Sequence, residues 1–458
     1  MTARPSKPSP SLKSPRELRQ VAASALRLAQ AAGVPETEVQ IDETVDALTR
    51  FANNAIHQHV AEQGIVVSIR TVADGRTARV TTNRVDEHSL RQAIENSISL
   101  ASQQPKDPKL LPLPGKQKYR SVQRFHPATA ALSPSDRARA VRSACQLAEK
   151  RGQVAAGIFS SGQNQCLLVN SRGLAAHYGQ SHATFSVTMQ QGSATGWAKG
   201  NAGDYRRFNP AQLACTASEK AARAENPLEL PTGRYTVILE PAAVLDLVGF
   251  LFYDFAATSA ADKRSCFSGR VGKPLLGKNI TITDDAYHSD QLGMNFDGEG
   301  VPRQRVTLVE NGLVKNLVYS RRSARLAKAR PTGHGFALPN EYGEAPVNLV
   351  VAGGETPLER MIASTDRGLL VTRFWYIREV DPYEKVMTGM TRDGLFLVEK
   401  GKITQAARNF RFNQSVLEML RNVESLGPAC RATGEESFEM VVPPMKVREF
   451  QFSEVTKF

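Results

Sequence analysis

Residues 295–320, NFDGEGVPRQRVTLVENGLVKNLVYS, contain the pattern that decides the fold of the second half of this chain. Two runs rich in β-branched and apolar residues flank Asn311-Gly312, a dipeptide that strongly favours the tight turn of a hairpin. Upstream, Asp297-Gly298 predicts a turn that leads into this hairpin. The stretch therefore predicts an antiparallel hairpin within residues 306–320.

Other segments of the second half are also dominated by strand signals. Residues 235–240 predict a strand, and a second hairpin is expected around Glu399-Lys400-Gly401-Lys402. The most apolar segment, 242–261, is interrupted by Asp246 and Asp254. Because a membrane span tolerates such carboxylates poorly, this segment predicts a buried helix over 242–257.

The first half of the chain contains two units of comparable helix and strand content. The first predicts a capped helix after Ser14, strands at 39–51, 65–72 and 76–81, and a helix at 90–101. The second predicts a capped helix after Ser133, strands around 153–160, 165–170 and 183–190, and a helix near 210–224. We therefore predict an α+β protein, with N-terminal helix-on-sheet domains followed by a strand-dominated C-terminal domain with large, mainly antiparallel sheets.

The composition is that of an ordinary globular protein. Of 458 residues, 41% are hydrophobic and 22% are charged, which argues against disordered, collagenous and disulfide-scaffold classes. Residues 1–20 predict a disordered basic tail, since no apolar run follows their charges as a secretory signal requires. Five widely spaced cysteines without a CxxC pair favour reduced thiols, and we expect a cytoplasmic protein.

The net charge of +13 raises the question of nucleic-acid binding. The densest basic run comprises Arg321, Arg322, Arg325, Lys328 and Arg330, and only Tyr319 supplies an aromatic ring nearby. A groove for single-stranded nucleic acid would interleave cations with aromatic rings. The run therefore favours a solvated helix face, and a nucleic-acid-associated protein is the least favoured interpretation.

Several short blocks, in a fixed order, resemble the TldD/PmbA (TldD/TldE) metalloprotease family. They are residues 295–320, Thr332-Gly333-His334-Gly335, Thr356-Pro357-Leu358-Glu359, residues 394–401 and, nearer the start, Arg50-Phe51-Ala52-Asn53-Asn54 with Ile56-His57-Gln58. The resemblance implies a first domain at 21–103, a linker at 104–127, a central domain at 128–225 and a C-terminal domain at 232–455.

The resemblance also implies two kinds of subunit. The active kind carries His-Glu-x-x-x-His on a helix of its C-terminal domain, where two imidazoles hold Zn²⁺ and a carboxylate takes a proton from bound water. None of the eight histidines of this chain forms that motif. Its expected place, 248–253, reads VGFLFY and offers no good zinc ligand. We hypothesise that a former catalytic helix has become core or subunit interface.

The resemblance therefore implies a chain closer to the non-catalytic TldE/PmbA-type subunit, a pseudoenzyme in a cytoplasmic metalloprotease that acts on unfolded peptides. Cys430 resembles the family's late cysteine ligand, but its histidine partners are missing, so no metal or other cofactor is expected in this chain. Zinc is expected in a TldD-type homologue, with which this chain forms a heterodimer unless it self-associates instead.

An alternative is a peptidase in its own right with a noncanonical site. In this alternative the candidate catalytic residue is His334, which glycines flank on both sides, and it acts with Cys430. The competing interpretation of His334 is an exposed side chain on a tight loop.

Three further clusters could hold a metal, but each has a simpler interpretation. His57 and His59 share one face of a predicted strand, which a half-exposed strand also explains. The second cluster comprises Asp284, Asp285 and His288, and a turn explains it more readily. The third comprises Asn295, Asp297 and Glu299, which a turn also explains more readily.

Overall fold

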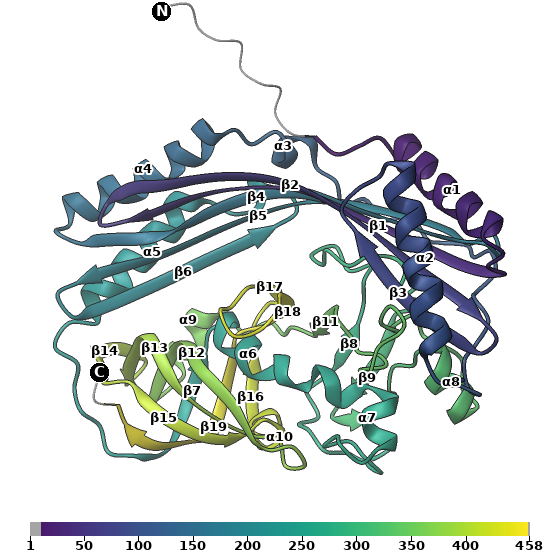
Figure 1. Ribbon diagram of the computed structural model, residues 1–458. Helices are drawn as coiled ribbons and strands as arrows, with labels where there is room; N and C mark the ends of the chain where they lie inside the picture. Colours follow the sequence, from purple (N-terminus) through teal and green to yellow (C-terminus); the bar gives the residue numbers. More distant parts are fainter. Residues whose placement is uncertain (1–10, 457–458) are drawn as a thin grey trace, which may run out of the picture.

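The computed structural model describes residues 11–456, and a six-stranded sheet built from the first half of the chain arches over the second half (Figure 1). Every neighbouring pair in this sheet is antiparallel. The strands are, in spatial order, β3 (Arg76–Thr82), β2 (Ala55–Ala73), β1 (Glu36–Ala52), β4 (Val154–Asn170), β5 (Ala175–Gln191) and β6 (Ala194–Ala202).

Strands β1 and β4 pair along almost their whole length, from Glu38 opposite Asn170 to Phe51 opposite Gly157. The regions expected as a first domain (21–103) and a central domain (128–225) therefore share one continuous sheet. Its two halves are related in construction, because each contributes three strands and a pair of covering helices.

The helices lie on the convex face of this sheet (Figure 1). They are α1 (Pro15–Ala31), α2 (Glu87–Gln103), the short α3 (Pro127–Ala130), α4 (Pro134–Lys150) and α5 (Pro210–Arg223), with a 3-10 turn η1 at Tyr205–Arg207. Capping boxes begin α1 and α4 as the sequence predicts, with Ser14 and Ser133 bonded to the backbone of the third helical residue. Because α1 begins at Pro15, residues 15–20 of the expected tail are helical, while residues 1–10 lie outside the described residues.

One predicted break in the sheet is wrong. Residues 153–160 and 165–170 are parts of a single strand, β4, and the expected interruption near Gly162 is regular paired backbone. The sequence also predicted no strand at 194–202, where β6 forms the edge of the sheet beside β5.

The segment expected as a linker is extended but tied down. Residues 104–126, all of which are described, form no helix or strand. The Leu113 amide donates to Glu36 Oε2 at 2.9 Å, and the Tyr119 hydroxyl donates to the carbonyl of Gly300 at 2.8 Å. This segment therefore binds the sheet to the C-terminal part of the chain.

The C-terminal part contains two further sheets. The smaller one comprises, in spatial order, β10 (Leu313–Val314), β9 (Val306–Glu310), β8 (Ile282–Asp284), β11 (Leu349–Val351), β18 (Met440–Val442) and β17 (Cys430–Ala432). The larger one comprises β12 (Arg367–Asp381), β7 (Gly233–Leu239), β19 (Met445–Val455), β15 (Phe410–Ser415), β13 (Val386–Glu399) and β14 (Lys402–Ala406), with β16 (Val423–Leu426) paired to β19. Both predicted hairpins, β9–β10 and β13–β14, are confirmed.

The larger sheet curls on itself, because β12 pairs with both β7 and β13. Inside it lie stacked phenylalanines, among them Phe374 and Phe450 with ring centroids 5.6 Å apart. Three helices pack against it: α6 (Pro241–Val248), α9 (Leu358–Ala363) and α10 (Val416–Arg421). The C-terminal part also contains the 3-10 segment η2 (Gly249–Phe255), α7 (Ala257–Ala261) and α8 (Arg321–Ala327). The α+β class with large, mainly antiparallel sheets is confirmed.

The single buried helix predicted for 242–257 is only half correct. The α-helix ends at Val248 and tightens into η2, where Gly249 lies against Ser437 so closely that a Cβ would meet its hydroxyl at 1.9 Å. Burial is confirmed, since Val244, Leu247 and Leu251 are inaccessible to solvent. Across the described residues, no helix is both long enough and apolar enough to cross a membrane.

Candidate functional site

The place where the active relatives would carry their metal motif lies across the end of α6 and the start of η2. Val248 and Leu251 are fully buried in the C-terminal core, and Phe252 packs edge-on against Phe438 with ring centroids 5.2 Å apart. Tyr253 is 39% exposed and stacks on Tyr342, 66% exposed, with centroids 6.1 Å apart. This segment is therefore partly core and partly an exposed aromatic surface.

The two carboxylates that flank this segment are committed to other partners. Asp254 pairs with Lys385 Nζ at 2.5 Å and accepts a hydrogen bond from the Cys266 amide. Asp246 accepts from the Phe374 amide at 3.0 Å, and burial raises the pKa of Asp246 to about 7. Over residues 11–456 no three His, Cys, Asp or Glu side chains come together as a metal ligand set. The donor set at this place does not fit zinc.

Cys430 lies on β17, with its Sγ 3.8 Å from the carbonyl oxygen of Val442. It is exposed, whereas His334 is almost completely buried at 1% exposure. No hydrogen bond or ion pair joins these two residues in the part of the chain that the structure describes.

His334 uses both of its ring nitrogens in contacts inside the protein. Nε2 lies 2.9 Å from Asp284 Oδ1, and Nδ1 lies 2.9 Å from the hydroxyl of Thr332. The expected tight loop with an exposed His is therefore wrong, because the aspartate draws the imidazole inward. The arrangement fixes the 332–335 loop to β8 and leaves neither nitrogen for a substrate.

The other cluster that includes Asp284 does not converge. Asp285 accepts from the Tyr287 amide, and His288 Nδ1 accepts from the Asp290 amide, so both organise the turn that the sequence favoured. On β2, His57 and His59 are exposed, and His59 Nδ1 lies 2.8 Å from the hydroxyl of Thr49.

The cluster at 295–299 forms the predicted turn. Asp297 is 1% exposed and accepts three amide hydrogen bonds, from Glu299, Val301 and Gly335, at 2.8 to 2.9 Å. Glu299 is also buried, and burial together with the neighbouring Asp297 raises the pKa of Glu299 to about 7.

The basic run lies on and after α8. Arg322 pairs with Asp107 at 2.9 Å, and residues 325–330 are exposed. No cation–π contact of these residues with an aromatic ring is present within 11–456, as expected for a solvated face.

A cavity of about 560 Å³ separates the concave face of the large sheet from the C-terminal part, directly beside η2. Alternate residues of β5, Gln180, His182 and Thr184, line it from the sheet, whereas their neighbours Ala183 and Phe185 pack under the helices. Phe252, Tyr253 and Phe438 line it from the other side. The cavity therefore adjoins the position of the missing motif, and we take it as the candidate functional site.

A cross-strand arrangement orients His182 at the edge of this cavity. Its Nε2 lies 2.9 Å from Asp46 Oδ1, although β4 separates their two strands. Gly162 stands between them in register, and a Cβ there would lie 2.1 Å from the Asp46 carboxylate and 2.8 Å from the His182 ring. The glycine therefore leaves the space in which the two side chains meet.

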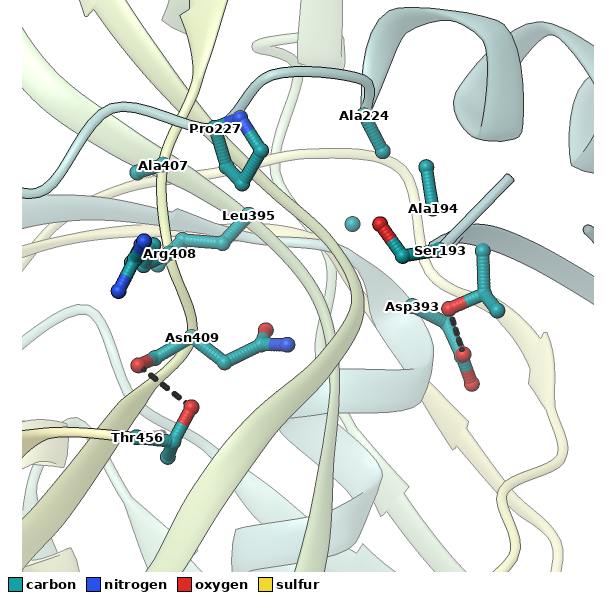
Figure 2. Close-up of a pocket in the computed structure, with 12 residues that line it drawn as sticks. Ser193, Ala194, Ala224, Pro227, Asp393, Leu395, Ala407, Arg408, Asn409 and Thr456 are labelled. Carbon is teal, nitrogen blue, oxygen red and sulfur yellow. Dashed lines mark hydrogen bonds between the residues drawn. The ribbon is translucent and has the colours of Figure 1, made fainter. Parts of the chain in front are cut away.

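A second, smaller cavity of about 350 Å³ lies where the β5–β6 turn meets the C-terminal sheet (Figure 2). The Thr195 hydroxyl donates to Asp393 at 2.7 Å, and Asp393 also binds Arg373. Figure 2 shows Thr456 bonded to the main-chain oxygen of Asn409 on the opposite wall. Of these contacts, the one between Thr195 and Asp393 joins the N-terminal sheet to the C-terminal part.

Sequence patterns do not point to four residues that line or support the larger cavity, namely His182, Asp46, Arg431 and Asn348. The only local signal was the polar alternation at 180, 182 and 184, which marks a strand face that avoids the apolar core. Their convergence depends on pairing β1, β4 and β5, which sequence spacing does not encode.

The fold combines an arched antiparallel sheet with a two-sheet C-terminal part, and comparisons with known proteins identify its family. Residues 37–101 match the PmbA/TldA metallopeptidase domain 1, and residues 232–454 match the PmbA/TldA metallopeptidase C-terminal domain. The chain belongs to the TldD/PmbA family.

Individual relatives are distant. The chain is 30% identical over 216 residues to the metalloprotease TldD homolog of Buchnera aphidicola subsp. Schizaphis graminum, which covers 46% of this chain and 42% of that protein. It is 23% identical to the metalloprotease PmbA of Escherichia coli O157:H7, and the match covers 70% of this chain and 71% of that protein. The crystal structure of TldE from Thermococcus kodakarensis superposes with a TM-score of 0.86 at 21% identity, covering 94% of this chain and all of that one. This last likeness shows the shared fold.

Proposed function

We propose that this chain is the non-catalytic partner subunit of a TldD/PmbA-type metallopeptidase that acts on unfolded peptides in the cytoplasm. The observation that carries the proposal is the side-chain set at 248–253, where packing residues replace the imidazoles and carboxylate of the active motif. The catalytic zinc then belongs to a TldD-type homologue bound to this chain.

The exposed aromatic pair Tyr253 and Tyr342 supports a role for this region at a subunit contact. Paired rings with 39% and 66% exposure are unusual on a solvated surface and common at interfaces. In this proposal the chain shapes one wall of the peptide chamber, with the larger cavity opening beside that contact.

Metal analysis and reconstitution test the proposal. The purified chain is expected to hold far less than one zinc per molecule and to hydrolyse no unfolded peptide. Co-purification with a homologue that carries His-Glu-x-x-x-His is expected to give a stable heterodimer with peptidase activity. Stoichiometric, tightly bound zinc in this chain, or hydrolysis by the chain alone, would contradict the non-catalytic role.

A matched pair of variants tests the place of the contact. Tyr342→Ala is expected to weaken association with the homologue at least tenfold. Tyr383→Ala, which removes a ring that is 53% exposed on the β12–β13 turn, is expected to leave it unchanged. If the chain instead associates with itself through the same tyrosines when no homologue is present, the assembly is a homodimer, which contradicts the proposed heterodimer.

A further inference from the structure

Arg431 brings a positive charge to the larger cavity without a bonded carboxylate. Its Nε donates to Asn201 Oδ1 at 2.7 Å, and its Nη1 donates to the Asp290 carbonyl at 3.2 Å and to Gln291 Oε1 at 3.3 Å. These acceptors are all neutral. Burial lowers the pKa of the guanidinium, as expected for a charge drawn out of water.

The carboxylates nearest to Arg431 do not complete its hydrogen bonds. Glu439 lines the same cavity, yet among the described residues no ion pair joins it to the guanidinium. The side chain of Asp290 is engaged by Arg207 at 2.7 Å. Nη2 of Arg431, with no protein hydrogen bond over residues 11–456, is therefore the nitrogen left for a ligand at the cavity wall.

Asn348, which lines the same cavity, holds a second unpartnered donor buried behind the wall. Asn348 is 3% exposed, and its Nδ2 has no hydrogen-bond partner. Gln291 links the two groups, because its Oε1 accepts from Arg431 and its Nε2 donates to the carbonyl of Leu349, the residue after Asn348. A buried amide donor without a hydrogen-bond partner destabilises the protein, and an acceptor atom of a ligand would remove that cost.

The rest of the wall is apolar and aromatic. Phe252, Tyr253 and Phe438 lie beside the polar half, with the Phe252 and Tyr253 ring centroids 3.9 Å apart. The cavity thus combines a cation that forms no ion pair among the described residues, an amide donor without a partner and an aromatic surface. This combination suits a carboxylate attached to an apolar side chain, although Glu439 in the same lining also attracts the guanidinium.

We propose that this cavity is a carboxylate-binding subsite for peptides, in which Arg431 Nη2 and Asn348 Nδ2 donate to the carboxylate oxygens and the aromatic wall receives the adjoining apolar side chain. The proposal rests on the proposed function for its choice of a peptide as ligand. The carboxylate could belong to a peptide C-terminus or to an acidic side chain, and both present the same acceptor atoms.

Titration calorimetry on the isolated chain tests the subsite with three synthetic peptides. They are acetyl-Ala-Ala-Phe with a free C-terminal carboxylate, the same peptide as its C-terminal amide, and acetyl-Ala-Glu-Phe amide. The free acid is expected to bind at least tenfold more tightly than its amide. If instead the glutamyl amide shows that gain, the subsite takes an acidic side chain, and if neither does, the proposal is wrong.

Variants separate a ligand contact from a structural role. Asn348→Leu removes the unpartnered donor at similar volume, so the fold is expected to be as stable as before while the preference for the carboxylate falls about tenfold. Arg431→Gln should abolish that preference, whereas Arg325→Gln, an exposed cation of α8, should not change it. An Asn348→Leu chain that keeps the full preference overturns the proposal.

These measurements are independent of the partner subunit. A reconstituted assembly that cleaves peptides while the isolated chain shows no carboxylate preference would remove the subsite and keep the partner role. A carboxylate preference in a chain that binds zinc and cleaves peptides alone would keep the subsite and remove the non-catalytic partner role.

Discussion

Three buried aspartates of this protein, Asp284, Asp254 and Asp246, differ in the partners of their carboxylates. Asp284 has His334 beside it, and although burial alone would raise its pKa, the charge and hydrogen bond of His334 lower it. Asp254 has Lys385 as its counter-ion. Asp246 has neither, and one of its oxygens, Oδ1, lacks a hydrogen-bond partner within the described chain. Of these three aspartates, only Asp246 is therefore expected to fold more favourably in its neutral form.

Asp246 should give the protein a pH-dependent stability. Its pKa is raised from 3.8 to about 7 in the folded chain, so the folded state binds more protons than the unfolded state between those values. Stability contributed by the neutral form is present below pH 4 and is lost as pH rises toward 7. Asp246→Asn should remove this loss and raise the free energy of unfolding at pH 8 by on the order of 3 kcal/mol.

Urea unfolding at pH 4.5 and pH 8 measures this effect. The two proteins should be close in stability at the lower pH and differ at the higher one. The exposed Asp262→Asn variant serves as the control and should follow the parent at both. An Asp246→Asn chain that is no more stable than the parent at pH 8 would show that the carboxylate is ionised at no cost.

At the scale of elements, the sequence predicted helices better than the path of the sheet. The capping boxes at Ser14 and Ser133 place two helix starts, because capping is decided by residues three positions apart. Gly162-Gln163-Asn164 resembles a turn when read locally, yet it lies inside β4. Gly162 is paired with Asp46 of β1 and with His182 of β5, and these two side chains meet across it. No local sequence pattern reveals such a contact between strands. The same limit kept His182 and Arg431 out of the predicted site.

Gly162 should therefore be intolerant of even a methyl group. A Cβ would lie 2.1 Å from Asp46 Oδ1 and 2.7 Å from the Val45 carbonyl, so the Asp46–His182 contact and the β1–β4 pairing must give way. We expect Gly162→Ala to destabilise the chain by about 1–3 kcal/mol. Gly179 of β5 is the matched control, because a Cβ there meets nothing closer than 3.8 Å. Chemical denaturation that ranks both variants equally would contradict this account of the β4 glycine.

Hydrogen bonds at several separate places join the N-terminal sheet to the C-terminal part. They include Lys199 with the Gly434 carbonyl at 2.7 Å, Thr195 with Asp393, and Arg431 with Asn201. The walls of the larger cavity belong to different parts of the chain, so its shape depends on these hydrogen bonds. Unlike a flexible pair of domains, the two parts should then unfold as one cooperative unit.

Arg124, in the extended segment 104–126, forms another buried contact with the C-terminal part. It is 8% exposed, and its Nη2 donates to the carbonyls of Ala286 and His288, both at 2.9 Å. Arg124→Met keeps the apolar stem but leaves those carbonyls unpaired, so we expect a loss of about 2–4 kcal/mol in the free energy of unfolding. Hydrogen exchange should increase across 285–293, next to the cavity, while Arg142→Met on the exposed face of α4 changes neither quantity. Because residues 291–293 line the cavity, the same variant should also weaken binding of the free-acid peptide. Unchanged exchange across 285–293 would mean that Arg124 does not set the position of this wall.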